Sequence, residues 1–325
     1  MSFTSFEDAD HIVDRFINLL HSLDIHPAVG SKIEDEFLSP LQLLESTRNL
    51  GALANNPELR ADAGGMYDFA AKLLAVETQP EFKSFIPHLR LFEAGAAFAT
   101  AVQPKNGDIR DDVNRKLAEL YLGALAIHFA FDVELDHPVK SRGDNPDVMF
   151  RVEPDGFPAS RWALAIKTVS SRAGQTIFEN IQKAAKQIDS AACPADRGMV
   201  VINLKNSLQH DQLWRSTYTS LDRARAALGT QMDELIAAVE TGRPASDWEP
   251  LFAHRAAPLV FYFAQAVVRL RLPDGKEVPT ILKMAKLENP LGRQDPVAQT
   301  IALQLNDGMQ TILRGIPGAP GQVPA

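Results

Sequence analysis

The feature that most constrains the fold of this chain is a succession of three strand-like segments between two helical ones. Apolar and polar residues alternate over residues 129–135, which is typical of a half-buried strand. A second strand is predicted over residues 147–152 and a third over residues 161–169, with a turn at residues 153–156 between them. With the segments on either side, residues 108–205 are predicted to form helix, strand, strand, strand, helix and strand.

The flanking segments complete this order. Helical spacing of apolar residues follows two aspartates at residues 111–112 and continues to about residue 128, and it returns over residues 175–191. Residues 198–204 are nearly all apolar, which is typical of a central strand that is buried on both faces. The sequence therefore predicts an α/β protein with a mixed sheet.

Residues 1–107 are predicted to form an α-helical module that packs against the rest or binds a partner. Helix starts are expected at Ser39–Pro40 and Asn56–Pro57, because a capping side chain stands directly before proline. A further helix is expected from Pro80, with a kink or break at Pro87. The pair Gly64–Gly65 is expected to interrupt the second of these helices.

Two boundaries follow from composition. The polar stretch 103–108, which contains Pro, Asn and Gly, is predicted to separate the helical module from an α/β domain over residues 108–314. That domain is expected to end with a β-hairpin over residues 258–285 and a helix over residues 296–313. Residues 315–325, rich in Pro and Gly, are predicted to be a flexible tail.

Charge and composition restrict the function classes. The net charge of −8 argues against coating nucleic acid through charge alone, although basic residues gathered along one groove would still suit a nuclease. No apolar run reaches the length of a membrane span, and no signal peptide is expected. A single cysteine, Cys193, excludes an internal disulfide and fits a cytoplasmic protein. Self-association stays open.

A short motif lies on the second and third predicted strands. Pro146 and Asp147 stand at the start of the second, and Lys167 stands near the end of the third. With the order of elements over residues 108–205, this pattern resembles the PD-(D/E)XK nuclease superfamily, whose core is an αβββαβ unit. The family pattern has an acid two residues before the lysine, and this chain has Ala165 there.

The resemblance implies metal-dependent hydrolysis of phosphodiesters. Such chemistry needs a hard cation, Mg²⁺ or Mn²⁺, which prefers oxygen ligands and lowers the pKa of the attacking water. By resemblance, Asp147 is a metal ligand, the backbone carbonyl of Ile166 is another, and Lys167 orients the water or stabilises developing charge.

Three explanations of Ala165 remain open. In the first, alanine replaces the natural acid in an inactive form of the protein. In the second, the acid comes from another position of the chain. Glu119 on the preceding helix is then the best donor, ahead of Asp136, Glu134 and Asp144. The third explanation is a non-catalytic relative that binds nucleic acid or protein.

Polar and basic residues near the motif could contact phosphates. Gln182, Lys183 and Lys186 share a face of the helix after the third strand, and Arg142 and Arg172 lie in loops at the two ends of the site. For each of the three helix residues taken singly a solvated surface is the better explanation, and for the two arginines it is an equally good one. The leading hypothesis is a metal-dependent nuclease that acts on DNA in defence, restriction or repair. The alternatives are a non-catalytic module that binds nucleic acid and a regulator that binds a protein through the helical module.

Overall fold

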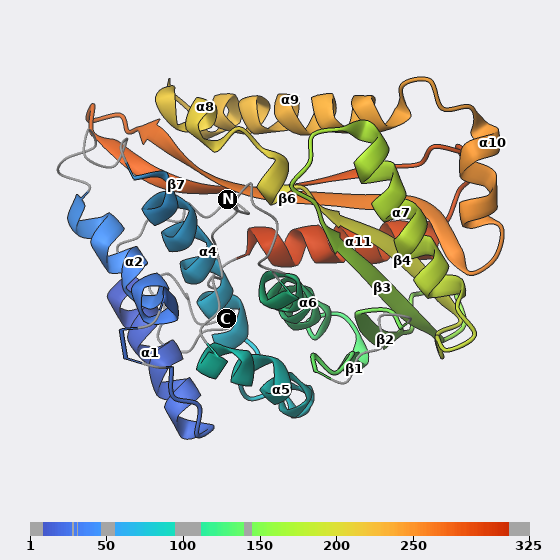
Figure 1. Cartoon of the computed structure of the whole chain (residues 1–325), viewed down its shortest axis with the longest axis horizontal. Helices are drawn as coiled ribbons and strands as arrows, with labels where there is room; N and C mark the ends of the chain where they lie inside the picture. The colour runs from blue at the N-terminus through green and yellow to red at the C-terminus, as the bar shows by residue number, and fades with distance from the viewer. Residues whose placement is uncertain are drawn as a thin grey trace.

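The computed structural model describes residues 9–27, 29–30, 32–46, 56–94, 112–139 and 145–311. At its centre is a seven-stranded sheet in the order β1-β2-β3-β4-β6-β5, with β7 paired to β6 (Figure 1). The strands are β1 (Phe131–Leu135), β2 (Val148–Val152), β3 (Ser160–Thr168), β4 (Arg197–Asn203), β5 (Thr217–Tyr218), β6 (Ala256–Arg271) and β7 (Glu277–Glu288).

The sheet is mixed. Strands β1, β2 and β3 pair antiparallel in succession, whereas β3, β4 and β6 are parallel and β7 returns antiparallel along β6. The α/β class with a mixed sheet is thus confirmed. Because β2 runs opposite to β3 and β4, the start of β2 lies beside the ends of β3 and β4, so that loops from all three strands meet at one end of the sheet.

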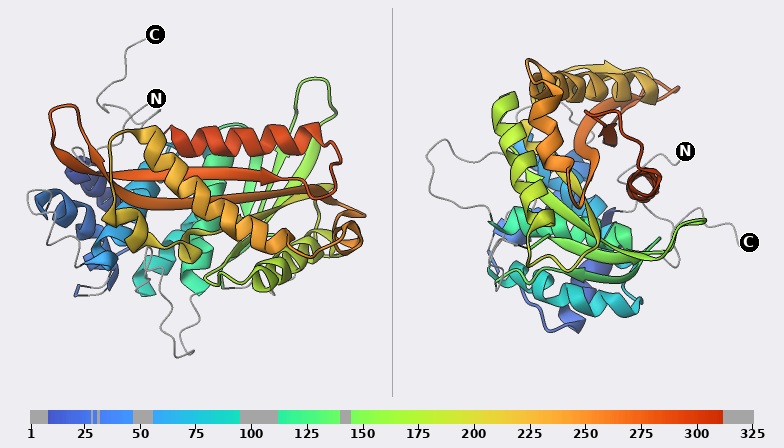
Figure 2. Two further views of the ribbon diagram at one scale, coloured as in Figure 1. Left: turned by 90° about the horizontal axis from the view of Figure 1, so that it is seen from above. Right: turned by 90° about the vertical axis from the view of Figure 1, so that its right-hand side faces the viewer.

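Helices cover both faces of the sheet. On one face α7 (Gly174–Asp189) and α9 (Leu221–Glu240) bury their apolar residues in a common cluster. The other face is covered by α4 (Pro57–Leu74), α6 (Asp112–Ala126) and α11 (Pro296–Gln310), which contribute to a second cluster. The right-hand view of Figure 2 shows α7 and α11 on opposite sides of the curled sheet.

The remaining elements are short or lie at the N-terminal end. Helices α1 (Ala9–Ser22) and α2 (Lys32–Ser46) pack with α4 around a group of phenylalanine rings that is continuous with the second cluster. Among the described helices, none combines the length and apolar character that crossing a membrane requires. The shorter elements are η1 (Pro80–Phe85), α5 (Ile86–Leu89), η2 (Arg90–Ala94), η3 (Lys205–Ser207), α8 (His210–Arg215), α10 (Ala245–Trp248) and η4 (Glu249–Phe252).

The predicted helix starts in this region had different outcomes. The start at Asn56–Pro57 is confirmed, because the Asn56 Oδ1 accepts a hydrogen bond from the backbone N–H of Leu59 at 3.0 Å. The start at Ser39–Pro40 is wrong: both residues lie inside α2, and the Ser39 hydroxyl donates to the carbonyl of Glu36 instead of capping the helix. Gly64–Gly65 does not interrupt α4, which is continuous.

The other predicted helices and strands are confirmed, apart from the start of the first strand and its alternation of apolar and polar residues. Pro87 lies in the single turn of α5 between 3-10 helices, as expected of a helix break. The first strand begins at Phe131 rather than residue 129, and the Phe131 side chain is 51% exposed. Its alternation fails because Asp132 has φ +53° and the register shifts between Phe131 and Glu134. The predicted boundary at 103–108 and the tail at 315–325 lie outside the described residues.

Candidate active site

Asp147 and Lys167 meet where the start of β2 lies beside the end of β3. The Lys167 Nζ is 4.0 Å from the Asp147 Oδ2, and both residues are 6% exposed. The same carboxylate oxygen accepts a hydrogen bond from the backbone N–H of Ile166 at 2.6 Å. Residues that are 20 positions apart in sequence thus form one buried charged group, as the antiparallel pairing of two short strands requires.

Gln187 of α7 holds this pair from the side of the helix. The Lys167 Nζ donates a hydrogen bond to the Gln187 Oε1. The amide of the same glutamine donates to the backbone carbonyl of Asn145 at 3.2 Å, two residues before Asp147. A single side chain therefore connects the lysine on β3 with the segment that carries the aspartate.

Glu119 supplies a second carboxylate from α6. It is 3% exposed, and its Oε2 accepts from the Lys116 Nζ at 2.8 Å and lies 3.4 Å from the His88 Nε2. Burial raises the pKa of Asp147 to about 7, and the negative charge of Glu119 adds to this rise. Lys167 and the N–H of Ile166 act in the opposite direction. The Glu119 carboxylate is therefore close enough to oppose the ionisation of Asp147.

His88 of α5 extends the buried group. Burial, with the nearby positive charge of Lys116 and the nearby His137, lowers the pKa of His88 to about 3, so the ring is neutral at pH 7. A neutral ring that donates from Nε2 to Glu119 has a lone pair on Nδ1, since only one ring nitrogen then carries a proton.

Several buried acceptor atoms around the site lack a partner. Within the described part of the chain, the His88 Nδ1, the Asp136 Oδ2 and the Asn145 Oδ1 make no hydrogen bond. The backbone N–H of Asp136 donates to the carbonyl of Asp147, which places this residue at the same end of the sheet. Unpaired buried acceptors are costly unless a donor or a cation satisfies them.

These donors restrict the kind of metal that fits. Over the described ranges, no three His, Cys, Asp or Glu side chains are placed to bind an ion by themselves. Asp147 and Glu119 give two carboxylates, which suits Mg²⁺ because it usually takes one or two and keeps several waters. The described side chains of the site include one imidazole, His88, and no thiolate.

Ala165, two residues before Lys167 on β3, is fully buried. Val148 pairs with Leu164, so the next step along the ladder brings Ala165 beside Asp147. Its methyl group packs in the apolar cluster beneath α7, with Ile177 and Ile181 among the members. The strand therefore offers a packed methyl group there, and the second carboxylate at this site comes from α6.

The predicted phosphate contacts have different surroundings. Lys183 and Lys186 are exposed on α7, and Gln182 is half-buried there. Arg172 donates to the carbonyl of Ser207 at 2.8 Å and pairs with Glu234. Arg142, like Asp144, lies outside the described residues, and Glu134 pairs with Arg161 at 2.7 Å rather than joining the site.

Two contributors were missed from sequence. These are Gln187 of α7 and His88 of α5, neither of which was singled out from the sequence. For Gln187, the signal in the sequence is its position between Ala184 and Ile188, two buried residues of the helix, because this places its side chain toward the sheet. Comparison with protein-family models, curated proteins and solved structures found no match to this chain. Function is therefore argued from the residues themselves.

Proposed function

We propose that this protein is a metal-dependent nuclease that hydrolyses phosphodiester bonds, with DNA as the substrate and Mg²⁺ or Mn²⁺ as the cofactor. The observation that carries the proposal is the convergence of Asp147, Glu119 and Lys167 at one end of the sheet. The order α6, β1, β2, β3, α7, β4 supports it, because this is the order expected of a PD-(D/E)XK core.

Asp147 and Glu119 would hold the cation, with the carbonyl of Ile166 as a further ligand by resemblance. The raised pKa of Asp147 fits this role, because burial and the nearby charge of Glu119 disfavour its ionised form, and a divalent ion would offset both effects. A bound Mg²⁺ would polarise the phosphoryl oxygen and lower the pKa of the attacking water. The unpaired acceptors of Asp136 and Asn145 could bind its water ligands.

Lys167 has the role of orienting the attacking water and stabilising charge on the phosphoryl group. Its ammonium lies beside Asp147, so it would stand next to the cation and the scissile phosphate. Gln187 of α7 accepts a hydrogen bond from Lys167 and so orients the ammonium group. The lysine therefore has a second partner besides Asp147. In this account Glu119 replaces the acid that residue 165 lacks, so the native chain is catalytically complete.

A cleavage assay tests the proposal. The protein is incubated with single- and double-stranded DNA and RNA, with Mg²⁺ or Mn²⁺ or with a chelator, and Lys167→Ala is measured beside it. We expect metal-dependent cleavage that the Lys167→Ala variant loses by at least about 100-fold. Cleavage that survives in Lys167→Ala would indicate a contaminant. If the native protein does not cleave any substrate but still binds DNA in a salt-sensitive way, the result would favour a non-catalytic binding module.

A further inference from the structure

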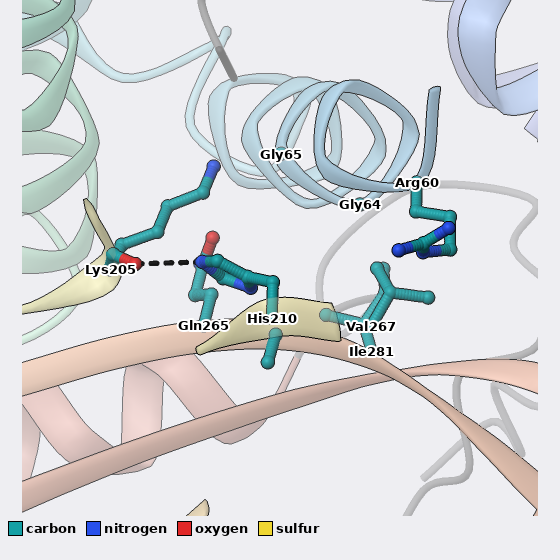
Figure 3. Close-up of a pocket in the computed structure, with 9 residues that line it drawn as sticks. Arg60, Gly64, Gly65, Lys205, His210, Gln265, Val267 and Ile281 are labelled. Carbon is teal, nitrogen blue, oxygen red and sulfur yellow. Dashed lines mark hydrogen bonds between the residues drawn. The ribbon is translucent and has the colours of Figure 1, made fainter. Parts of the chain in front are cut away.

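A groove lies beyond the candidate active site, between α4, α6 and the ends of β3 and β4. It has two adjoining lobes that share Gly65, Lys205 and Gln265, and their volumes, open solvent included, are about 360 and 550 Å³. Figure 3 shows the first lobe, with the Lys205 side chain extending toward α4 above His210 and Gln265.

The first lobe presents positive charge. Arg60 of α4 lines it with a side chain that is 4% exposed, held by Asp211 at 2.6 Å and by the ring of Trp214 at 4.8 Å. Lys205 provides a second cation. None of the described residues that line either lobe is an aspartate or a glutamate. The Arg60 charge is paired with Asp211, so Lys205 is the cation that makes this recess suited to an anion.

Two further features preserve the shape of this lobe. The His210 Nε2 donates to the backbone carbonyl of Lys205 at 2.8 Å. This hydrogen bond fixes the start of η3, whose first residue is Lys205. Gly64 lets α4 approach β6 closely, because a Cβ at this position would lie 2.6 Å from the Val267 Cγ2. The wall opposite Lys205 therefore contains bare helix backbone at Gly64 and Gly65.

The second lobe is of a different kind. Its apolar part comes from Leu117 and Ala118 of α6 and from Phe263 of β6. Its polar part includes Thr168 and Asn206, and the Asn206 amide makes no hydrogen bond within the described part of the chain. A flat heterocycle has apolar faces and a hydrogen-bonding edge, and these walls match both.

We propose that the groove binds a nucleoside phosphate, with the phosphate at Lys205 and the base beside Phe263 and Asn206. The described lining of the groove includes neither Asp147 nor Lys167. Thr168 directly follows Lys167 on β3, but successive side chains of a strand point to opposite faces of the sheet. The ligand is either a free nucleotide or the phosphorylated terminal nucleotide of a nucleic acid, since both present the same groups.

Calorimetric titration of the full chain without divalent metal tests this site independently of the proposed cleavage. The ligands are the four ribonucleoside 5′-monophosphates, their nucleosides and inorganic phosphate. We expect at least one monophosphate to bind with a Kd below about 1 mM, and about tenfold more tightly than its nucleoside or phosphate. Lys167→Ala is expected to bind it as the native chain does.

Three variants locate the binding. Lys205→Gln is expected to weaken the monophosphate about tenfold and leave the nucleoside unchanged, because it removes one charge-assisted contact. Asn206→Ala is expected to weaken nucleoside and monophosphate alike. Lys276→Gln is the control, since Lys276 lies in the exposed turn after β6 with a side chain that is 78% exposed.

The source of the ligand is decided with a tetranucleotide with and without a 5′-phosphate. Tighter binding of the phosphorylated tetranucleotide than of the monophosphate assigns the site to nucleic-acid ends, and the reverse assigns it to free nucleotides. The proposal is overturned if no monophosphate binds below about 1 mM, or if Lys205→Gln binds it as tightly as the native chain.

Discussion

The Lys167 ammonium lies 4.0 Å from the Asp147 carboxylate, and both groups are removed from solvent at the end of β3. Buried ion pairs seldom add stability, because the desolvation of two charges offsets most of their attraction. Here the cost is larger still, since Glu119 opposes the ionisation of Asp147 and raises its pKa. Stability alone gives little reason for such an arrangement, whereas a role in binding a cation and a phosphate does.

Gln187 is predicted to position Lys167 without touching substrate. Gln187→Leu removes the acceptor for the lysine and the donor to Asn145, and we expect the cleavage rate to fall about 10- to 100-fold with little change in substrate affinity. Gln187→Glu keeps an acceptor and is expected to regain part of the rate. Gln304→Leu, at an exposed position of α11, is the control. Equal rates for the native chain and Gln187→Leu would remove this role.

Ala165→Glu is predicted to destabilise the protein even if it restores the family motif. A larger, charged side chain must enter a fully buried position beside Asp147, and we expect the free energy of unfolding to fall by about 2–4 kcal/mol. Mg²⁺ is expected to recover part of this loss. Ala165→Gln has the same bulk without the charge and is expected to gain nothing from Mg²⁺. Identical responses of both variants to Mg²⁺ in chemical denaturation would contradict a cation at this position.

Replacement of the buried Asp68 is predicted to lower the free energy of unfolding much more than replacement of an exposed acid. The Asp68 carboxylate accepts from the Lys283 Nζ at 2.8 Å and from the Tyr121 hydroxyl and the Gln265 amide, both at 2.7 Å. Asp68→Ala leaves Lys283 buried and unpaired, so we expect a loss of about 3–5 kcal/mol. Asp274→Ala breaks an exposed pair with Lys276 and is expected to cost less than about 1 kcal/mol. If Asp68→Ala and Asp274→Ala lower the free energy of unfolding in urea by similar amounts, the buried network around Asp68 contributes no more to stability than an exposed ion pair.

His210 is predicted to make stability depend on acid pH. Burial lowers its pKa to about 4, and nearby Lys205 and Arg60 add to this, whereas the unfolded value is about 6.5. Between these values only the unfolded chain binds the proton, so stability falls as pH falls from 6.5 toward 4. In His210→Gln the loss between pH 7 and pH 4.5 is expected to be smaller by about 1–2 kcal/mol. His26→Gln is the control because His26 is exposed, and it should retain the native pH profile.

The order of strands and helices around the site was predictable because it depends on local periodicity. Asp147 and Lys167 could be paired from sequence, since a turn between two short antiparallel strands leaves few registers. The start at Ser39–Pro40 was wrong because packing overrides a local capping signal. Ile33 and Phe37 before it and Leu43 after it are all buried, so one continuous helix serves the core better than two.

The partners of the pair could not be predicted in the same way. Gln187 reaches Lys167 only because of the angle at which α7 crosses the sheet, and His88 reaches Glu119 only through the packing of α5 on α6. Neither relation has a fixed spacing in sequence. The recess between α4 and β6 depends likewise on residues as distant as Arg60 and Gln265, which only the folded chain brings together.

The most direct test of the account is the rate of Mg²⁺-dependent DNA cleavage by Glu119→Gln, with Glu153→Gln as the control. Glu119 is buried beside Asp147 at the candidate site, whereas Glu153 is exposed at the opposite end of β2. If Glu119 supplies the second carboxylate, Glu119→Gln should lose at least about 100-fold in rate while Glu153→Gln cleaves as the native chain does. Undiminished cleavage by a folded Glu119→Gln variant would contradict a cation site built from α6 and β2.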